Sequence, residues 1–123
     1  MKKILIVDDQ EDIRKLLEIV LRGEGRQLFF AVSGEQCLEM ARSCIPDLVL
    51  LDIMMPGGID GYQTMRCLKQ DPQTNDSLVV AMTAKVQDRE RCQALEAGAD
   101  GYIGKPFDVR DLQQQVQELL GES

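Results

Sequence analysis

The sequence predicts a single α/β domain built on a parallel β-sheet with helices on both faces. Two observations predict it. Short, nearly continuous runs of Ile, Leu and Val recur along the 123 residues, and amphipathic helical patterns separate them. Continuous apolar runs are typical of strands covered on both faces, and their alternation with helices indicates a doubly wound parallel sheet. Because no linker or low-complexity segment interrupts the pattern, we expect residues 1–123 to form one domain.

Five apolar runs are the predicted strands. They are Ile4–Val7, Leu28–Val32, Leu48–Leu51, Leu78–Met82 and Gly101–Ile103. The last run is the shortest and carries the weakest signal. In a five-stranded sheet of this kind, with strand order 2-1-3-4-5, the first and third strands are neighbours.

The segments between the strands place apolar residues at helical spacing. Ser33 and Gln36 have the spacing of a capping box, and Asp108 is the expected N-cap of the last helix. The predicted buried stripes are Ile13, Leu16, Leu17, Val20 and Leu21; Cys37, Leu38 and Ala41; Tyr62, Met65 and Leu68; Cys92, Leu95 and Ala99; and Val109, Leu112, Val116, Leu119 and Leu120.

Composition excludes several classes of function. With 14 basic and 21 acidic residues the net charge is −7, which argues against direct nucleic-acid binding because phosphate contacts need a basic face. No apolar stretch approaches the roughly 20 residues that span a bilayer. The apolar run near the N-terminus stops at Asp8, too soon for a signal peptide. We therefore expect a cytoplasmic protein with no membrane contact.

The cysteines do not form a recognisable site. Cys37, Cys44, Cys67 and Cys92 contain no C-x-x-C pair, and the chain has no histidine. This pattern predicts four reduced structural thiols rather than a zinc site. It also excludes a Ser-His or Cys-His catalytic pair.

Polar residues follow the predicted strands at the points where each strand ends. They are Asp8, Asp9, Asp52, Thr83 and Lys105. In open α/β sheets the carboxyl ends of the strands meet at the ligand-binding edge, so we expect these side chains to converge. Considered alone, Asp9 also fits a helix cap, Thr83 a strand-end hydroxyl and Lys105 a solvated lysine. Considered together, clustered carboxylates repel one another unless a cation joins them.

The chemistry of this set indicates a divalent cation and a phosphoryl group. Mg²⁺ prefers oxygen ligands and takes one or two carboxylates plus phosphate. A remaining carboxylate, such as Asp52, can act as nucleophile and form an aspartyl phosphate. Lys105 would supply a second positive charge, and the Thr83 hydroxyl a hydrogen bond to a phosphoryl oxygen.

Five segments give the chain a specific resemblance. They are Ile-Leu-Ile-Val-Asp-Asp at 4–9, Leu-Asp-Ile-Met-Met-Pro at 51–56, Asp-Gly at 60–61, Met-Thr-Ala at 82–84 and Gly-Ala-Asp-Gly-Tyr-Ile-Gly-Lys-Pro-Phe at 98–107. Over its whole length the chain resembles a receiver domain of the bacterial response regulators, the kind found alone in the chemotaxis regulator. The resemblance implies a flavodoxin-like (βα)₅ fold and a place in two-component signalling.

The resemblance also implies a role for each residue of the site. Asp52 would be the phosphoacceptor. Asp8, Asp9, Asp52 and the backbone carbonyl of Met54 would bind Mg²⁺, with Mn²⁺ as the alternative ion.

Other residues of the resemblance concern the response to the phosphoryl group. Thr83 would sense it, and Lys105 would pair with the acceptor and then with the phosphate. Tyr102 would change position on activation. The resemblance implies a cis bond between Lys105 and Pro106, in keeping with the near confinement of cis bonds to proline.

The implied function is a phosphorylation-activated switch. The implied partners are a sensor histidine kinase or phosphotransfer protein upstream, and an output protein or fused output domain downstream. A homodimer through the fourth helix, fifth strand and fifth helix is also implied. Such a domain is not an enzyme in the ordinary sense, although it assists its own phosphorylation and dephosphorylation.

Two positions depart from the usual pattern of the family. Gly57 and Gly58 both precede Ile59, where relatives usually have one residue fewer, which leaves the conformation of this loop open. Gly104 stands where a hydroxyl or another small residue is common. Met54 and Lys85, two positions beyond Asp52 and Thr83, are expected to affect the lifetime of the phosphorylated state.

Three other classes of protein fit parts of the sequence. A flavodoxin-like FMN binder would need a loop of Ser, Thr and Gly after the first strand, where this chain has Asp8 to Asp12. A phosphatase acting through an aspartyl phosphate would need a second acid near Asp52 and a substrate pocket. A phosphorylation-independent interaction domain would not need the full set of five residues.

Overall fold

The computed structural model describes residues 1–23, 25–55, 58–83 and 88–122, with the backbone alone described for residues 88–91. It contains a five-stranded, all-parallel sheet of order β2-β1-β3-β4-β5, so the predicted fold class and strand order are confirmed. The strands are β1 (Lys2–Val7), β2 (Arg26–Ala31), β3 (Leu48–Asp52), β4 (Leu78–Thr83) and β5 (Gly101–Gly104).

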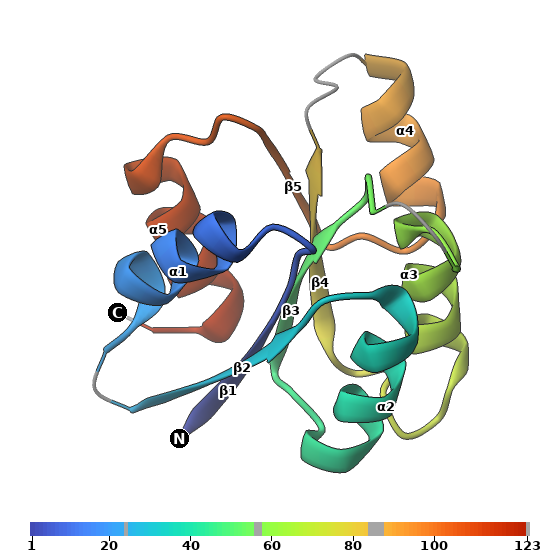
Figure 1. The fold of residues 1–123 in the computed structure, drawn as a ribbon, viewed down its shortest axis with the longest axis horizontal. Helices are drawn as coiled ribbons and strands as arrows, with labels where there is room; N and C mark the ends of the chain where they lie inside the picture. Colours follow the sequence, from blue (N-terminus) through green and yellow to red (C-terminus); the bar gives the residue numbers. More distant parts are fainter. Residues whose placement is uncertain (24, 56–57, 84–87, 123) are drawn as a thin grey trace.

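Helices cover both faces of the sheet. They are α1 (Glu11–Leu21), α2 (Gly34–Cys44), α3 (Gly61–Gln70), α4 (Asp88–Glu96) and α5 (Val109–Leu120). Figure 1 shows α1 and α5 together on one side of the sheet and α2, α3 and α4 on the other. The result is a three-layer arrangement in which every strand leads towards a loop at the same edge.

The side chains of each strand alternate between the two faces of the sheet, so each strand contributes to two separate hydrophobic cores. In β1, Leu5 and Val7 pack with the residues of α2 and α3, whereas Ile4 and Ile6 pack with Leu17 and the other apolar residues of α1 and α5. These strand residues are all fully buried. Burial on both faces explains why the strands appear in the sequence as continuous apolar runs.

The first two strands begin earlier than predicted. Lys2 pairs with Arg26 and Lys3 with Gln27, two residues before the apolar runs start. The hydrogen bonds between strands are made by backbone groups, so polar residues can extend the start of a strand. A search of the sequence for apolar runs does not detect such residues. β2 also ends at Ala31 rather than at Val32, which is 47% exposed.

The predicted buried stripe of the fourth helix was wrong at Cys92 and Leu95, whereas Ala99 is buried as predicted. Cys92 is exposed and Leu95 is 53% exposed, whereas Ala94 and Ala97 are buried. α4 ends at Glu96, so Ala99 lies beyond the helix. Small alanine side chains pack against the sheet here, and a search for bulky apolar residues places the stripe on the opposite side. Leu16 and Val109 of two other predicted stripes are each 41% exposed.

The predicted caps differ in how closely they match the structure. The Asp108 carboxylate accepts from the N–H groups of Arg110 and Asp111, as expected of an N-cap. Ser33 Oγ accepts from the Gln36 N–H, but the Gln36 side chain accepts from the N–H of Val32 rather than that of Ser33, so this capping box is incomplete. A complete capping box occurs instead at the start of α3.

All four cysteines are free, but only one fits the predicted structural role. Cys37 is fully buried, and its burial raises the pKa of the thiol to about 12. Cys44 is partly buried, whereas Cys67 and Cys92 are exposed. Within the described ranges, no helix combines the length and apolar character needed to span a membrane.

Candidate functional site

Asp8 and Asp52 lie side by side because their strands are neighbours. β1 and β3 are paired as far as Val7 and Leu51. Asp8 directly follows Val7, and Asp52 directly follows Leu51. The Asp8 N–H is held by the Ala31 carbonyl of β2 at 3.1 Å. Both aspartates are buried, with exposed fractions of 0% and 4%. Carboxylates at this depth need compensating charge or hydrogen bonds.

Asp9 completes a cluster of three carboxylates. One oxygen each from Asp8, Asp9 and Asp52 can be chosen so that all three lie within 4.8 Å of one another. Asp9 is exposed and does not cap α1, whose N-cap is Gln10 without a side-chain hydrogen bond. Buried and exposed carboxylate oxygens in one cluster fit a hard, partly hydrated cation such as Mg²⁺.

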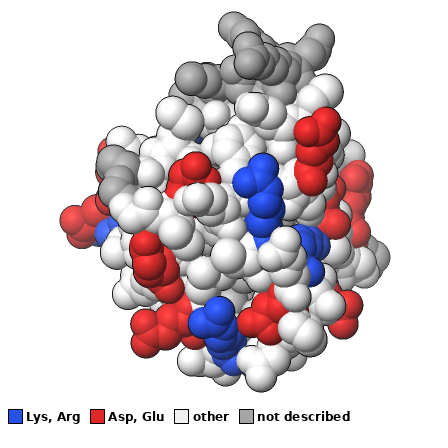
Figure 2. All heavy atoms as spheres, turned by 90° about the vertical axis from the view of Figure 1, so that its right-hand side faces the viewer, with Lys and Arg blue, Asp and Glu red and all other residues white. Residues whose placement is uncertain are grey.

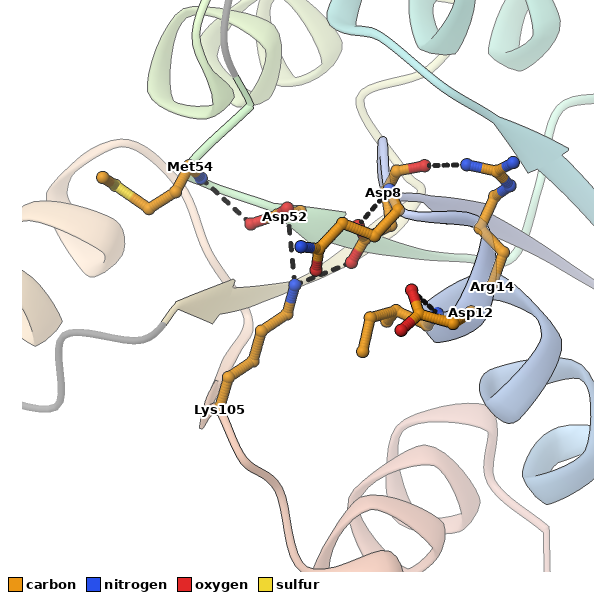
Figure 3. Close-up of polar contacts among 8 residues, drawn as sticks. Asp8, Asp12, Arg14, Asp52, Met54 and Lys105 are labelled. Atoms are coloured by element: carbon orange, nitrogen blue, oxygen red, sulfur yellow. Dashed lines mark hydrogen bonds and ion pairs between the residues drawn. The ribbon is translucent and has the colours of Figure 1, made fainter.

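Lys105 supplies the positive charge of the site. Its Nζ lies 2.7 Å from Asp8 Oδ2 and 3.4 Å from Asp52 Oδ2, as Figure 3 shows. The Lys105 backbone N–H donates to the Thr83 carbonyl at 2.8 Å, which fixes the lysine just beyond the sheet edge. The bond between Lys105 and Pro106 is cis, as the resemblance implied.

The charges of the site shift its pKa values. Burial raises the pKa of the Asp52 carboxyl, and the nearby Asp8 adds to this effect. The Met54 N–H and Lys105 oppose the rise but do not cancel it. Burial alone would lower the pKa of Lys105, but the hydrogen bond to Asp8 and the negative charges of Asp52 and Asp8 raise it. The raised pKa favours the charged form of Lys105, and three carboxyl groups beside one ammonium make a site that a divalent cation would stabilise.

Thr83 and Tyr102 lie on adjacent strands. Thr83 is the last residue of β4 and 2% exposed, and it pairs with Gly104 of β5. Tyr102 pairs with Ala81 and packs against the core beneath α2, α3 and α4. Val79 and Ala81 belong to the same core, so Thr83, two residues further on, points to the same face.

Met54 follows β3 at the rim of the site. Its N–H donates to Asp52 Oδ1 at 3.0 Å, and its side chain is 53% exposed. Met54 lines a pocket of about 220 Å³ together with Asp9, Gln10, Asp52 and Lys105. A larger hollow between the C-terminal ends of α1 and α5 contains none of the predicted site residues.

Arg14 is a member of the site that the sequence reasoning missed. Its guanidinium donates to the backbone carbonyl of Asp8 at 2.7 Å, and the Gln10 N–H donates to Asp8 Oδ1 at 2.9 Å. These bonds fix the backbone and one carboxylate oxygen of Asp8. One feature of the sequence could have indicated this role of Arg14: it is a basic residue near the start of the predicted helix that follows Asp8 and Asp9. Gly57, whose loop conformation the sequence left open, and Lys85, which is expected to affect the lifetime of the phosphorylated state, lie outside the described residues.

The sequence profile of the response regulator receiver domain matches residues 4–117. The chain belongs to the response regulator receiver domain family. The match covers the elements that form the site, and it decides against the FMN-binding alternative. The receiver domain is thus a domain of two-component response regulators.

Curated relatives of the receiver domain include transcriptional regulatory proteins. The chain is 40% identical over 123 residues to CpxR of Escherichia coli strain K12, covering 100% of the chain and 51% of the relative. It is 39% identical over 119 residues to the phosphate regulon regulator PhoB of Pseudomonas aeruginosa, covering 97% and 52%. The chain spans about half the length of these relatives.

Solved structures of receiver domains have the same fold. The signal receiver domain of a DNA-binding response regulator from Colwellia psychrerythraea 34H superposes with a TM-score of 0.91 at 26% identity, covering 99% of this chain and 100% of the other. The receiver domain of a histidine kinase from Syntrophus aciditrophicus superposes with a TM-score of 0.88 at 31% identity, covering 98% and 91%.

Proposed function

We propose that the receiver domain accepts a phosphoryl group on Asp52 in a Mg²⁺-dependent reaction and changes its partner binding when phosphorylated. The observation that carries this proposal is the contact of one ammonium, Lys105, with two buried carboxylates beside a third, exposed one. Such a cluster offers a nucleophile, a cation site and a fixed positive charge at one point.

In the proposed reaction an Asp52 carboxylate oxygen attacks the phosphorus of a phosphohistidine or a small acyl phosphate. A new P–O bond forms, and the bond from phosphorus to the leaving group breaks. The leaving group keeps that electron pair. Water later hydrolyses the aspartyl phosphate and restores the carboxylate. The domain assists both steps without turning over a separate substrate, so we class it as a regulatory domain rather than an enzyme.

Each residue of the site has a distinct part in this proposal. Asp8, Asp9, Asp52 and the Met54 carbonyl would hold Mg²⁺, or Mn²⁺ in its place. When bound, the ion supplies positive charge that stabilises the transferring phosphoryl oxygens. Lys105 keeps its charge at the sheet edge and can pair with the phosphoryl group once Asp52 is modified.

The proposed switch couples Thr83 to Tyr102. Both residues face the side of the sheet that α4 covers, and phosphate would draw the Thr83 hydroxyl towards the sheet edge. Tyr102 would then move into the space beside it and alter the surface formed by α4, β5 and α5. A homodimer through this surface is supported by the exposure of Leu95 and Val109, at 53% and 41%.

The proposed partners are a histidine kinase or phosphotransfer protein and an output protein or output domain. On the face seen in Figure 2, the coloured acidic and basic side chains are interspersed over a largely uncharged surface instead of forming a basic stripe. This distribution supports a protein partner rather than nucleic acid for that face.

Incubation with acetyl phosphate and Mg²⁺ tests the proposal. Intact mass should show one phosphoryl adduct on the wild type and none on Asp52→Asn. Chelation of divalent ions should abolish the adduct on the wild type. An adduct of equal yield on both proteins would show that Asp52 is not the acceptor.

In the absence of metal ions, replacing Asp52 with asparagine is expected to raise the free energy of unfolding at pH 7. Because burial and Asp8 raise its pKa, the folded state holds the Asp52 proton more tightly than the unfolded chain does. The free energy of unfolding therefore falls as the pH rises through the folded pKa, and the variant avoids this loss at pH 7. Mg²⁺ at ten times its dissociation constant should stabilise the wild type by about 1.4 kcal/mol.

Urea unfolding with and without Mg²⁺ measures both effects. The stabilisation of Asp52→Asn by Mg²⁺ should be clearly smaller than that of the wild type. If the ion stabilised both proteins equally, Asp52 would have no part in binding it.

A further inference from the structure

Ile59, two residues before α3, is hydrogen-bonded to a side chain from another part of the fold. Glu35, in the first turn of α2, accepts a hydrogen bond from the Ile59 N–H through Oε1 at 2.8 Å. These residues are 24 positions apart. The hydrogen bond from Ile59 lowers the pKa of the Glu35 carboxyl, so the interaction is charge-assisted at neutral pH.

Two glycines make room for this contact. Gly58 has a φ of 58°, and a Cβ built on it would collide with the Glu35 carboxylate. A Cβ on Gly34 would lie 2.7 Å from Cγ1 of Ile59 and would collide with Thr64. The start of α2 can therefore approach Ile59 only because both glycines lack a side chain.

The contact at Ile59 leads directly to the acceptor strand. Ile59 is followed by Asp60, the N-cap of α3, and then by Gly61, whose N–H donates to the Ile53 carbonyl at 3.3 Å. Ile53 lies between Asp52 and Met54 and is 3% exposed, so it has little room to move independently. A shift of Ile59 would thus be transmitted to the backbone that carries Met54.

We propose that Glu35 is a positioning residue of the phosphorylation site. It fixes the segment from Gly58 to Gly61, and through it the Met54 backbone, without touching the reacting atoms. This inference rests on the proposed function for the role of Met54 as a metal ligand. Its consequence is that a residue of α2, which makes no contact with the reacting atoms, contributes to the affinity of the site for Mg²⁺.

Three variants separate positioning from a general loss of stability. Glu35→Ala removes the acceptor, and Glu35→Gln keeps an acceptor oxygen without the charge. Glu39→Ala is the matched control, because Glu39 is an exposed acid one turn further along α2 and its carboxylate has no hydrogen bond within the described part of the chain. Wild type and variants are titrated with Mg²⁺ alone and followed by the NMR shift of the Met54 amide. Hydrogen exchange at the Ile59 amide is measured on the same samples.

Glu35→Ala should raise the half-saturating Mg²⁺ concentration by about tenfold, the lower end of the effect of outer-shell partners on metal affinity. It should also speed exchange at Ile59. Glu35→Gln should recover at least part of the affinity, and Glu39→Ala should match the wild type. Faster exchange at Ile59 with unchanged Mg²⁺ affinity in Glu35→Ala would overturn the inference, as would equal losses in Glu35→Ala and Glu39→Ala.

The wild type reports separately on the proposed function. A wild type that binds Mg²⁺ but takes no phosphoryl group would contradict the proposed function. The comparison of Mg²⁺ affinities among the variants would still test whether Glu35 positions the site. A wild type that binds no Mg²⁺ would contradict both.

Discussion

Replacing Lys105 with methionine is expected to slow phosphorylation of Asp52 by acetyl phosphate by about 100-fold, the usual scale for loss of one group that stabilises transition-state charge. Methionine keeps an apolar stem of similar length but has no ammonium to face Asp8 and Asp52, which lie 2.7 Å and 3.4 Å from Nζ. Without that charge the two carboxylates repel each other and an incoming phosphoryl group more strongly. Initial rates of adduct formation, followed by intact mass at saturating Mg²⁺, measure the effect.

Lys69→Met is the matched control for this variant. The Lys69 side chain is 22% exposed against 16% for Lys105, and its Nζ is likewise bound to an acid, Asp100, at 2.7 Å. Its ammonium also donates to the Ser77 carbonyl, and neither Asp100 nor Ser77 belongs to the proposed phosphorylation site. Phosphorylation of Lys69→Met should proceed at nearly the wild-type rate at a temperature where all three proteins are folded. Equal slowing in both variants would assign the effect of Lys105 to folding rather than to charge at the site.

A methyl group at Gly61 is expected to lower the free energy of unfolding by about 3 kcal/mol, the upper end of the usual cost of overpacking. A Cβ at this position would lie 2.5 Å from the Cα of Ile53 and 2.9 Å from the Asp52 carbonyl oxygen. These atoms belong to the backbone of the acceptor strand and its continuation, so they cannot turn aside as a flexible side chain would. Urea unfolding of Gly61→Ala measures the loss.

Gly23→Ala provides the comparison for Gly61→Ala. A Cβ at Gly23 would meet only the Arg26 side chain, at 4.0 Å, and its φ is not in the left-handed region. This variant should be as stable as the wild type or slightly more stable, since alanine restricts the unfolded chain. If Gly61→Ala were equally stable, α3 would not pack against the acceptor strand as closely as the structure shows.

The sheet could be predicted from the sequence because its strands are buried on both faces. Burial of Leu48 to Leu51 on either side leaves a continuous apolar run, and the strand order is the one expected of the fold class that the resemblance implies. Signals of this kind fail where packing uses small residues. Ala94 of α4 and Ala97 just beyond it are buried while the bulkier Leu95 is exposed, so the predicted stripe failed at Cys92 and Leu95.

The residues of the site could be predicted because they follow strand ends. The register of β1 and β3 brings Asp8 beside Asp52, and β4 with β5 brings Lys105 to Thr83. The positions of strand ends do not predict contacts that depend on the direction of a long side chain. Arg14 reaches back to a carbonyl six residues earlier, and Glu35 reaches a segment in a different part of the chain. Neither contact has a fixed spacing in sequence.

Under the proposed function, the residues that would receive the phosphoryl group and those that would respond to it lie in different parts of the fold. Asp8, Asp52 and Lys105 gather at the sheet edge, whereas Thr83 and Tyr102 face the core beneath α2, α3 and α4. Glu35 adds a third contact, from α2 to the segment after β3.

Reductive mapping of the phosphorylated wild type tests the identity of the acceptor most directly. Borohydride reduces an aspartyl phosphate to homoserine, so the modified position is read from the peptide masses without any substitution in the protein. After treatment with acetyl phosphate and Mg²⁺, homoserine is expected at position 52 and at no other aspartate. Homoserine at position 8 or 9, or none in a protein whose intact mass shows the adduct, would contradict the assignment of Asp52 as the acceptor.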